Sequence, residues 1–140
     1  MQFIKHLVRY SLVFGAAYFT HFTFATSSPV LELEKPATVT TLAAGIFSPE
    51  QGIICDEKAG FCVDGFGISM AFTQSYLGDD AQNKMLKMIE EVGGSDNFDS
   101  SRFSFSNKVY CDSAERACFD DRYSETKQIP FTDTLFAEEK

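Results

Sequence analysis

The chain has 140 residues with 20 acidic and 12 basic side chains, which gives a formal net charge of −8 at pH 7. An acidic surface repels nucleic-acid phosphates and anionic lipids and attracts cationic proteins. We therefore expect no nucleic-acid partner. The alternative interpretation of this charge is that it only keeps an exported protein soluble.

The N-terminal segment over residues 1–25 has the order of a secretory signal peptide. Lys5 and Arg9 precede the apolar run SLVFGAAYFTHFTFA, and Ala25 is a small residue at the expected cleavage position. The run covers roughly 15 residues, fewer than the roughly 20 that span a bilayer. We expect cleavage, a periplasmic or secreted location and no stable membrane insertion, with a retained anchor as the alternative.

Cleavage would also remove both histidines, His6 and His21. A mature chain without imidazole cannot run a Ser-His or Cys-His nucleophile and cannot build a histidine-containing zinc or copper site. Carboxylates, lysines and tyrosines remain as acid or base groups, but no pair of them stands out. We expect a protein that is not an enzyme and has no cofactor.

The segment over residues 26–45 contains two prolines and several threonines without a sustained period. This composition predicts a flexible leader. Downstream of it, we expect a single disulfide-stabilised domain over residues 46–140, because a mature chain of roughly 115 residues is enough for one core.

The four cysteines form two copies of the pattern Cys-Asp-x5-Cys-x-Asp, the first beginning at Cys55 and the second at Cys111. In an oxidising compartment cysteines are more often bridged than metallated or catalytic. Strand-forming residues precede each first cysteine, and turn residues follow it, among them Gly60. Short loops close most easily, which favours Cys55–Cys62 and Cys111–Cys118 among three possible connectivities.

The repeat continues beyond the cysteines, because FTQSYL over residues 72–77 matches FTDTLF over residues 131–136 once three extra residues are allowed in the second copy. Two bridged hairpins, each followed by Phe-Thr and an apolar pair, indicate an old duplication, with chance similarity as the alternative. Thr73 and Thr132 are then candidate helix N-caps.

Between the two copies, DDAQNKMLKMIEEVGG predicts a helix over residues 80–92, with Asp79 or Asp80 as its cap and two glycines after it. Five apolar side chains share one face of this helix: Ala81, Met85, Met88, Ile89 and Val92. We expect the helix to pack across a sheet through Met85, Met88 and Ile89.

The expected fold class is α+β, with a small antiparallel sheet from two disulfide-bridged hairpins and one main helix packed on it. The stretch RFSFS alternates strictly, which predicts a strand with Phe103 and Phe105 on one face and a turn after it. We expect an aromatic core made of Phe72, Phe103, Phe105, Tyr110 and Phe131.

Aspartate recurs beside the cysteines, at Asp56, Asp64, Asp112 and Asp120, with Asp121 nearby. A calcium site needs six to eight oxygen ligands, and the order Asp-x-Asp-x-Asp-Gly of a dedicated loop is missing. Aspartates that cap turns explain the same positions through local backbone hydrogen bonds. We therefore expect no metal site.

The runs FSPEQGIICDEKAGFCVDGFGISMAFTQSYLGDDA, FSFSNKVYCDSAERACFDDRYS and TDTLF resemble the YcgJ-like, or Fels prophage protein-like, family of small exported bacterial proteins. The resemblance covers about residues 47–136. It implies a periplasmic or secreted location and a small cysteine-containing domain. It implies no activity, substrate or catalytic residue.

We place a candidate binding surface on the two hairpin tips, residues 56–61 and 112–117, together with the exit of the second hairpin at residues 120–122, because a bridged loop loses little conformational entropy when it docks. Its residues are Asp56, Glu57, Phe61, Asp112, Glu115, Asp120, Asp121 and Arg122. The hypothesis is an interaction module, such as an inhibitor or immunity-like binder of a cationic envelope protein. The alternative is a structural or stress-associated envelope protein without a dedicated target, in which the bridges serve only to hold the fold.

Overall fold

The computed structural model describes residues 38–137 and belongs to the α+β class, as expected. Five antiparallel strands form the first sheet in the order of the chain: β1 (Thr40–Ala43), β2 (Ile46–Ser48), β3 (Ile54–Asp56), β4 (Phe61–Asp64) and β5 (Gly67–Ser69). The second sheet has three antiparallel strands: β6 (Arg102–Ser104), β7 (Tyr110–Asp112) and β8 (Ala117–Phe119). The predicted signal peptide and most of the predicted leader lie outside the described residues.

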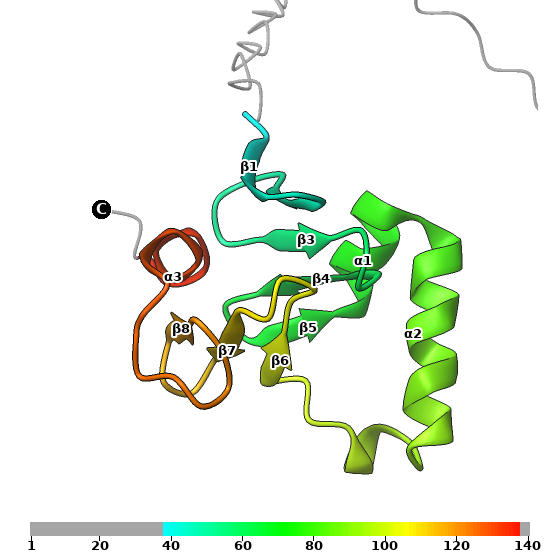
Figure 1. Ribbon diagram of the computed structural model, residues 1–140. Helices are drawn as coiled ribbons and strands as arrows, with labels where there is room; N and C mark the ends of the chain where they lie inside the picture. Colours follow the sequence, from blue (N-terminus) through cyan, green and yellow to red (C-terminus); the bar gives the residue numbers. More distant parts are fainter. Residues whose placement is uncertain (1–37, 138–140) are drawn as a thin grey trace, which may run out of the picture. The chain divides into compact units, whose positions relative to one another are not determined.

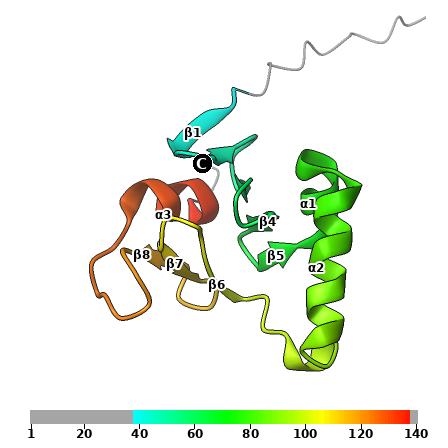
Figure 2. The same ribbon diagram turned by 45° about the vertical axis from the view of Figure 1, so that its right-hand side comes forward.

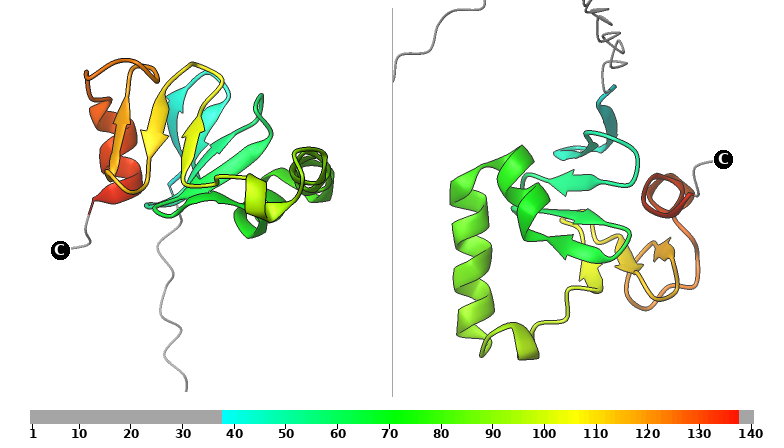
Figure 3. Two further views of the ribbon diagram at one scale, coloured as in Figure 1. Left: turned by 90° about the horizontal axis from the view of Figure 1, so that it is seen from below. Right: turned by 180° about the vertical axis from the view of Figure 1, so that it is seen from behind.

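Within residues 38–137, three α-helices accompany the sheets: α1 (Met70–Leu77), α2 (Asp79–Glu91) and α3 (Ile129–Phe136). A short 3-10 helix, η1 (Ser95–Asn97), follows α2. The five-stranded sheet lies between two groups of elements, with α1 and α2 on one side and α3 with the second sheet on the other (Figures 1 and 2). The view from below in Figure 3 shows the same order of layers.

Both predicted disulfides are confirmed, and each closes a two-stranded hairpin. Cys55 lies opposite Cys62 in the pairing of β3 with β4, and Cys111 lies opposite Cys118 in the pairing of β7 with β8. We expected one sheet to contain both hairpins. The structure instead places one hairpin in each of two sheets.

The structural repeat extends over a larger unit than the sequence showed. The first repeat, residues 46–77, consists of β2, β3, β4, β5 and α1. The second repeat, residues 102–136, runs through β6, β7, β8 and α3. Three strands correspond at the constant offset that separates Cys55 from Cys111, and β2 pairs with β3 in the same register as β6 with β7. Even the turn conformation is repeated, because Gly60 (φ 80°) corresponds to Arg116 (φ 50°).

The two threonines of the repeated Phe-Thr motif are equivalent, but they do not cap helices. Ser69 is the N-cap of α1, and Gln128 is the N-cap of α3. The hydroxyl of Thr73 instead accepts a hydrogen bond from the backbone N–H of Cys62 at 2.9 Å, and that of Thr132 accepts one from Cys118 at 3.0 Å. Each threonine lies one turn inside its helix and ties that helix to the bridged hairpin.

The two repeats pack around one main core with unlike faces towards each other. Successive residues of a strand point to opposite faces, so the bridge of each repeat lies on one face, which we call the disulfide face. In the first repeat the opposite face, with Ile46, Ile54, Phe61 and Val63, is buried in the main core. The second repeat contributes its disulfide face and α3 to the same core, through Phe103, Phe105, Cys111, Cys118, Phe131, Leu135 and Phe136.

The aromatic core is largely as predicted. Phe103, Phe105 and Phe131 are at most 4% exposed. Phe72 and Tyr110 are only half-buried, because Phe72 packs in a smaller cluster around the Cys55–Cys62 bridge and Tyr110 faces away from the main core. The sheet also begins upstream of the boundary placed at Ile46, since β1 pairs with β2.

Helix α2 forms where the sequence predicts it, but Gly78 precedes it and no side chain caps it. It packs mainly against α1 rather than across a sheet. Met85 is 5% exposed and Ile89 is half-buried, whereas Met88 is 40% exposed. Helix α2 therefore buries fewer of its apolar side chains than the sequence predicts.

Candidate interaction surface

The first hairpin tip contributes less surface than predicted, because Asp56 is fully buried. Its Oδ1 atom accepts hydrogen bonds from the backbone N–H groups of Lys58 and Ala59 at 3.0 and 2.9 Å. Its carboxylate also accepts from the backbone N–H and the hydroxyl of Ser106, at 2.6 and 3.0 Å. Asp56 thus joins the two repeats and is unavailable to a partner.

Phe61 is likewise a core residue, at 8% exposure. Its ring packs edge-on against Phe103, with centroids 6.3 Å apart, and stacks on Phe105 at 6.1 Å. The position of Phe61 after the turn suggested an exposed tip. The structure corrects this, because the strand that Phe61 begins turns the ring towards the second repeat.

The second hairpin tip is more open. Asp112 is half-buried, and its Oδ1 atom accepts from the backbone N–H groups of Ala114 and Glu115 at 2.8 and 3.3 Å. This is the same turn capping that Asp56 provides. Within residues 38–137 no hydrogen bond corresponds to those from Ser106, so Asp112 accepts hydrogen bonds from its own turn only. Glu115 is exposed.

The exit of the second hairpin gathers charges around Tyr110. The guanidinium of Arg122 lies over the Tyr110 ring, 5.8 Å from its centroid. Both residues line a cavity of about 490 Å³ together with Asp99 and Arg102. Arg102 faces Asp112 across β6 and β7. The structure therefore groups Asp112 and Arg122, which we predicted for the binding surface, with Arg102 and with Tyr110, which we predicted for the core.

Asp99 is the most perturbed carboxyl group in this cavity. The hydroxyl of Ser101 donates to it at 2.6 Å, and the guanidinium of Arg102 forms an ion pair with it at 2.6 Å. These hydrogen bonds lower the pKa of Asp99 from 3.8 to about 2. The charge of Arg102 is therefore largely matched within the chain.

Asp120 and Asp121 act locally. Asp120 accepts a hydrogen bond from the side-chain amide of Gln128, and Asp121 accepts one from the backbone N–H of Tyr123 at 2.7 Å. Asp64 caps the turn after β4 in the same way, through Phe66. Among the residues that the structure describes, no three His, Cys, Asp or Glu side chains form a group that could hold a metal ion.

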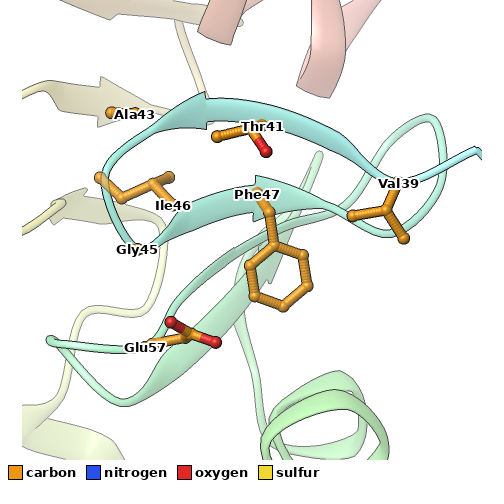
Figure 4. A pocket seen from close by; sticks show the side chains of 7 residues that line it. All are labelled: Val39, Thr41, Ala43, Gly45, Ile46, Phe47 and Glu57. Atoms are coloured by element: carbon orange, nitrogen blue, oxygen red, sulfur yellow. The ribbon is translucent and has the colours of Figure 1, made fainter.

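A second hollow lies beside the first hairpin tip, over the disulfide face of the five-stranded sheet. Helix α1 covers the bridge of this sheet through Thr73, Phe72 and Leu77. Phe47 of β2 packs against the edge of the same cluster, and beyond it, over β1 and β2, lies a hollow of about 370 Å³. Figure 4 shows Val39, Phe47 and Glu57 on the same side of the β1–β2 ribbon. The full lining is Val39, Thr41, Ala43, Gly45, Ile46, Phe47 and Glu57.

Sequence reasoning identified one residue of this hollow, the exposed Glu57. Phe47 was missed, although a signal for it exists. It occupies the same position relative to the cysteines of its repeat as Phe103 does in the second repeat. Extending the repeat upstream of the cysteines would have found it.

These features define a class of protein, namely a small α+β domain of two disulfide-bridged repeats. The chain belongs to the YcgJ family, whose model, described as YcgJ protein, matches residues 46–136. It is 40% identical over 81 residues to "Uncharacterized protein YcgJ" of Escherichia coli (strain K12), an alignment that covers 58% of this chain. The chain spans 59% of the length of that relative. No solved structure matches it.

The two bridges are compatible with an extracellular protein, since disulfides persist in oxidising compartments. Within residues 38–137, no helix has both the length and the apolar character needed to cross a membrane.

Proposed function

We propose that this chain is a periplasmic or secreted, non-enzymatic interaction module that binds a cationic protein of the cell envelope, in the manner of an inhibitor or immunity protein. Its negative charge favours encounter with such a partner. The two bridges stiffen the hairpins, so little conformational entropy is lost when the adjoining surface docks.

One observation carries the proposal, namely that the same face is covered in one repeat and open in the other. Phe103 in the second repeat is 4% exposed beneath Phe61, whereas its counterpart Phe47 is only half-buried beside the hollow. An apolar hollow with a carboxylate at its rim is suited to a partner that brings an apolar group and a cation. Glu57 supplies that carboxylate.

The experiment compares three forms of the oxidised mature chain as bait in envelope extract. The first is the unchanged chain, the second carries Glu57→Lys, and the third carries Glu125→Lys. Both replaced glutamates are exposed, so the variants have the same net charge and differ in where the charge is reversed. We expect one protein to bind the unchanged chain and the Glu125 variant, to be lost with the Glu57 variant and to elute as salt is raised.

Two results would count against the proposal. Equal loss of the partner with both variants would show that only net charge matters. Absence of any salt-sensitive partner would favour a structural or stress-associated envelope protein without a dedicated target.

A further inference from the structure

The repeat shows what the hollow beside Phe47 is shaped to hold. In each repeat a phenylalanine, a first cysteine and a second cysteine lie in one row across the sheet: Phe47, Cys55 and Cys62 in the first, Phe103, Cys111 and Cys118 in the second. In the second repeat an aromatic side chain of another repeat, Phe61, lies on the phenylalanine of this row. In the first repeat the corresponding place is the hollow.

The residues at the rim differ in a way that indicates the charge of the occupant. Glu57 corresponds to Ser113 in the alignment of the two repeats, and the backbone N–H groups of both donate to equivalent carbonyls, those of Gly45 and Ser101. The hydroxyl of Ser113 is buried. The carboxylate of Glu57 is exposed at the hollow and can accept hydrogen bonds from a lysine or arginine.

The backbone next to the hollow is an edge of the sheet. Among the described residues β1 pairs only with β2, and its four residues include no charge and no proline, the usual protections of an edge strand. The opposite edge is closed, because the backbone N–H of Ile68 donates to the carbonyl of Ser100 at 2.9 Å. A bulge between Thr41 and Ala43 limits regular pairing on β1 to its first half.

Charge distinguishes among the possible occupants. The chain's own segment PVLELEK, a few residues before β1, contains two glutamates, one lysine and no aromatic residue. A second copy could offer the exposed Tyr123 beside Arg122, but Asp120 and Asp121 come immediately before them. Both would bring a net negative charge towards Glu57. A cationic partner brings the complementary charge.

We propose that the hollow formed by Val39, Thr41, Phe47 and Glu57 binds an extended segment of a cationic protein. The segment inserts one aromatic side chain onto Phe47, as Phe61 lies on Phe103, and sets a lysine or arginine against Glu57. Its backbone runs along the open edge at Thr41, a mode in which main-chain hydrogen bonds add to side-chain specificity. The inference rests on the proposed function and names the chemistry of its partner.

The direct test uses capped hexapeptides and the oxidised mature chain, followed by amide NMR. The peptide KTKFKT should shift the amide signals of Thr41, Phe47 and Glu57 in a saturable way. Its alanine counterpart KTKAKT should bind at least about tenfold more weakly, the factor expected from losing the burial of one aromatic ring. The acidic counterpart ETEFET should bind more weakly still, and added salt should reduce the difference between KTKFKT and ETEFET.

Two variants on one strand supply the matched control. Thr40 and Thr41 are both exposed and point to opposite faces of β1. Thr41→Lys places an ammonium group in the hollow beside Glu57, where it takes the place of the cation of the peptide. It should reduce peptide affinity about tenfold or more, which corresponds to the loss of one contact of about 1.4 kcal/mol. Thr40→Lys adds the same charge on the other face and should leave the affinity within about twofold of the unchanged chain. Equal thermal midpoints would show that both variants are folded.

The outcomes separate this inference from the proposed function. If KTKFKT binds no better than KTKAKT, or if Thr41→Lys and Thr40→Lys act alike, the aromatic site is wrong. If an envelope partner is captured equally well by the Thr41 variant, the proposed function stands and the hollow is excluded. If the peptides bind as expected and no envelope partner is found, the hollow stands and the proposed function falls. Sedimentation that changes with Thr41→Lys would indicate a second copy as the occupant and would overturn the proposal.

Discussion

Replacing Asp56 by alanine should destabilise the protein far more than the same change at Asp112, although both aspartates follow the first cysteine of a bridged hairpin. Asp56 is fully buried and accepts four hydrogen bonds, two from its own turn and two from Ser106 of the second repeat. Asp112 is half-buried and accepts two, both from its own turn. The comparison isolates the contact between repeats.

The magnitude follows from these bonds. A hydrogen bond to a charged group contributes about 1.5 to 3 kcal/mol, and a donor left buried without a partner loses a similar amount. The turn donors can regain water, so the two bonds from Ser106 dominate. We expect Asp56→Ala to lower the free energy of unfolding by about 3 to 6 kcal/mol and Asp112→Ala by about 1 kcal/mol.

The assay is reversible urea unfolding of the oxidised protein, followed by circular dichroism. If Asp56→Ala does not fold, Ser106→Ala provides a milder change, because it removes only the hydroxyl bond and should lower the free energy of unfolding by about 1 kcal/mol. Equal losses for Asp56→Ala and Asp112→Ala would refute the role of Asp56 in joining the repeats. An unaffected Ser106→Ala variant would refute the contribution of the hydroxyl.

Three further predictions concern other contacts. Thr73→Val should lower the free energy of unfolding by about 1 to 3 kcal/mol, because it leaves the buried backbone N–H of Cys62 without an acceptor. Thr132→Val should lower it by less, because the side chain of Thr132 is only half-buried. Urea unfolding measures both changes. Met85→Asp should lower the free energy of unfolding by several kcal/mol, since it buries a charge at a position that is 5% exposed. An unchanged midpoint of thermal unfolding would contradict this prediction. The pKa of Asp99, about 2 in the folded protein, lies below the value of the unfolded chain. The hydrogen bonds from Ser101 and Arg102 to the Asp99 carboxylate therefore stabilise the fold above about pH 4, and this contribution is lost as the pH falls towards 2. In carbon-detected NMR titration, Ser101→Ala should raise this pKa.

The local elements could be predicted from the sequence because local interactions determine them. The two bridged hairpins follow from strand residues, turn residues and a cysteine spacing that brings the thiols opposite each other. The alternation of RFSFS correctly placed Phe103 and Phe105 on one buried face. Helix α2 follows from its polar and apolar period and from the glycines after it.

Burial could not be predicted from the same local patterns, because it depends on which faces of the repeats meet. Asp56 and Asp112 share a motif and a turn, but only Asp56 is covered by the other repeat. Phe47 and Phe103 share a place in the sheet, but only Phe103 has an aromatic neighbour from the other repeat. Met88 has the period of a core residue and is exposed because α2 contacts mainly α1.

The candidate site likewise combines features that the sequence predicts with features that depend on tertiary packing. The two bridged hairpins and the exposed turn at Glu57 could be predicted from the chain alone, since cysteine spacing and turn chemistry are local properties. The inward orientation of Phe61 and the hollow beside Glu57 depend instead on how the repeats and α1 pack. Within residues 38–137, the two repeats pack with unlike faces together, so the second repeat covers the main-core face of the first, while only α1 covers the disulfide face of the first and the part over β1 and β2 stays open.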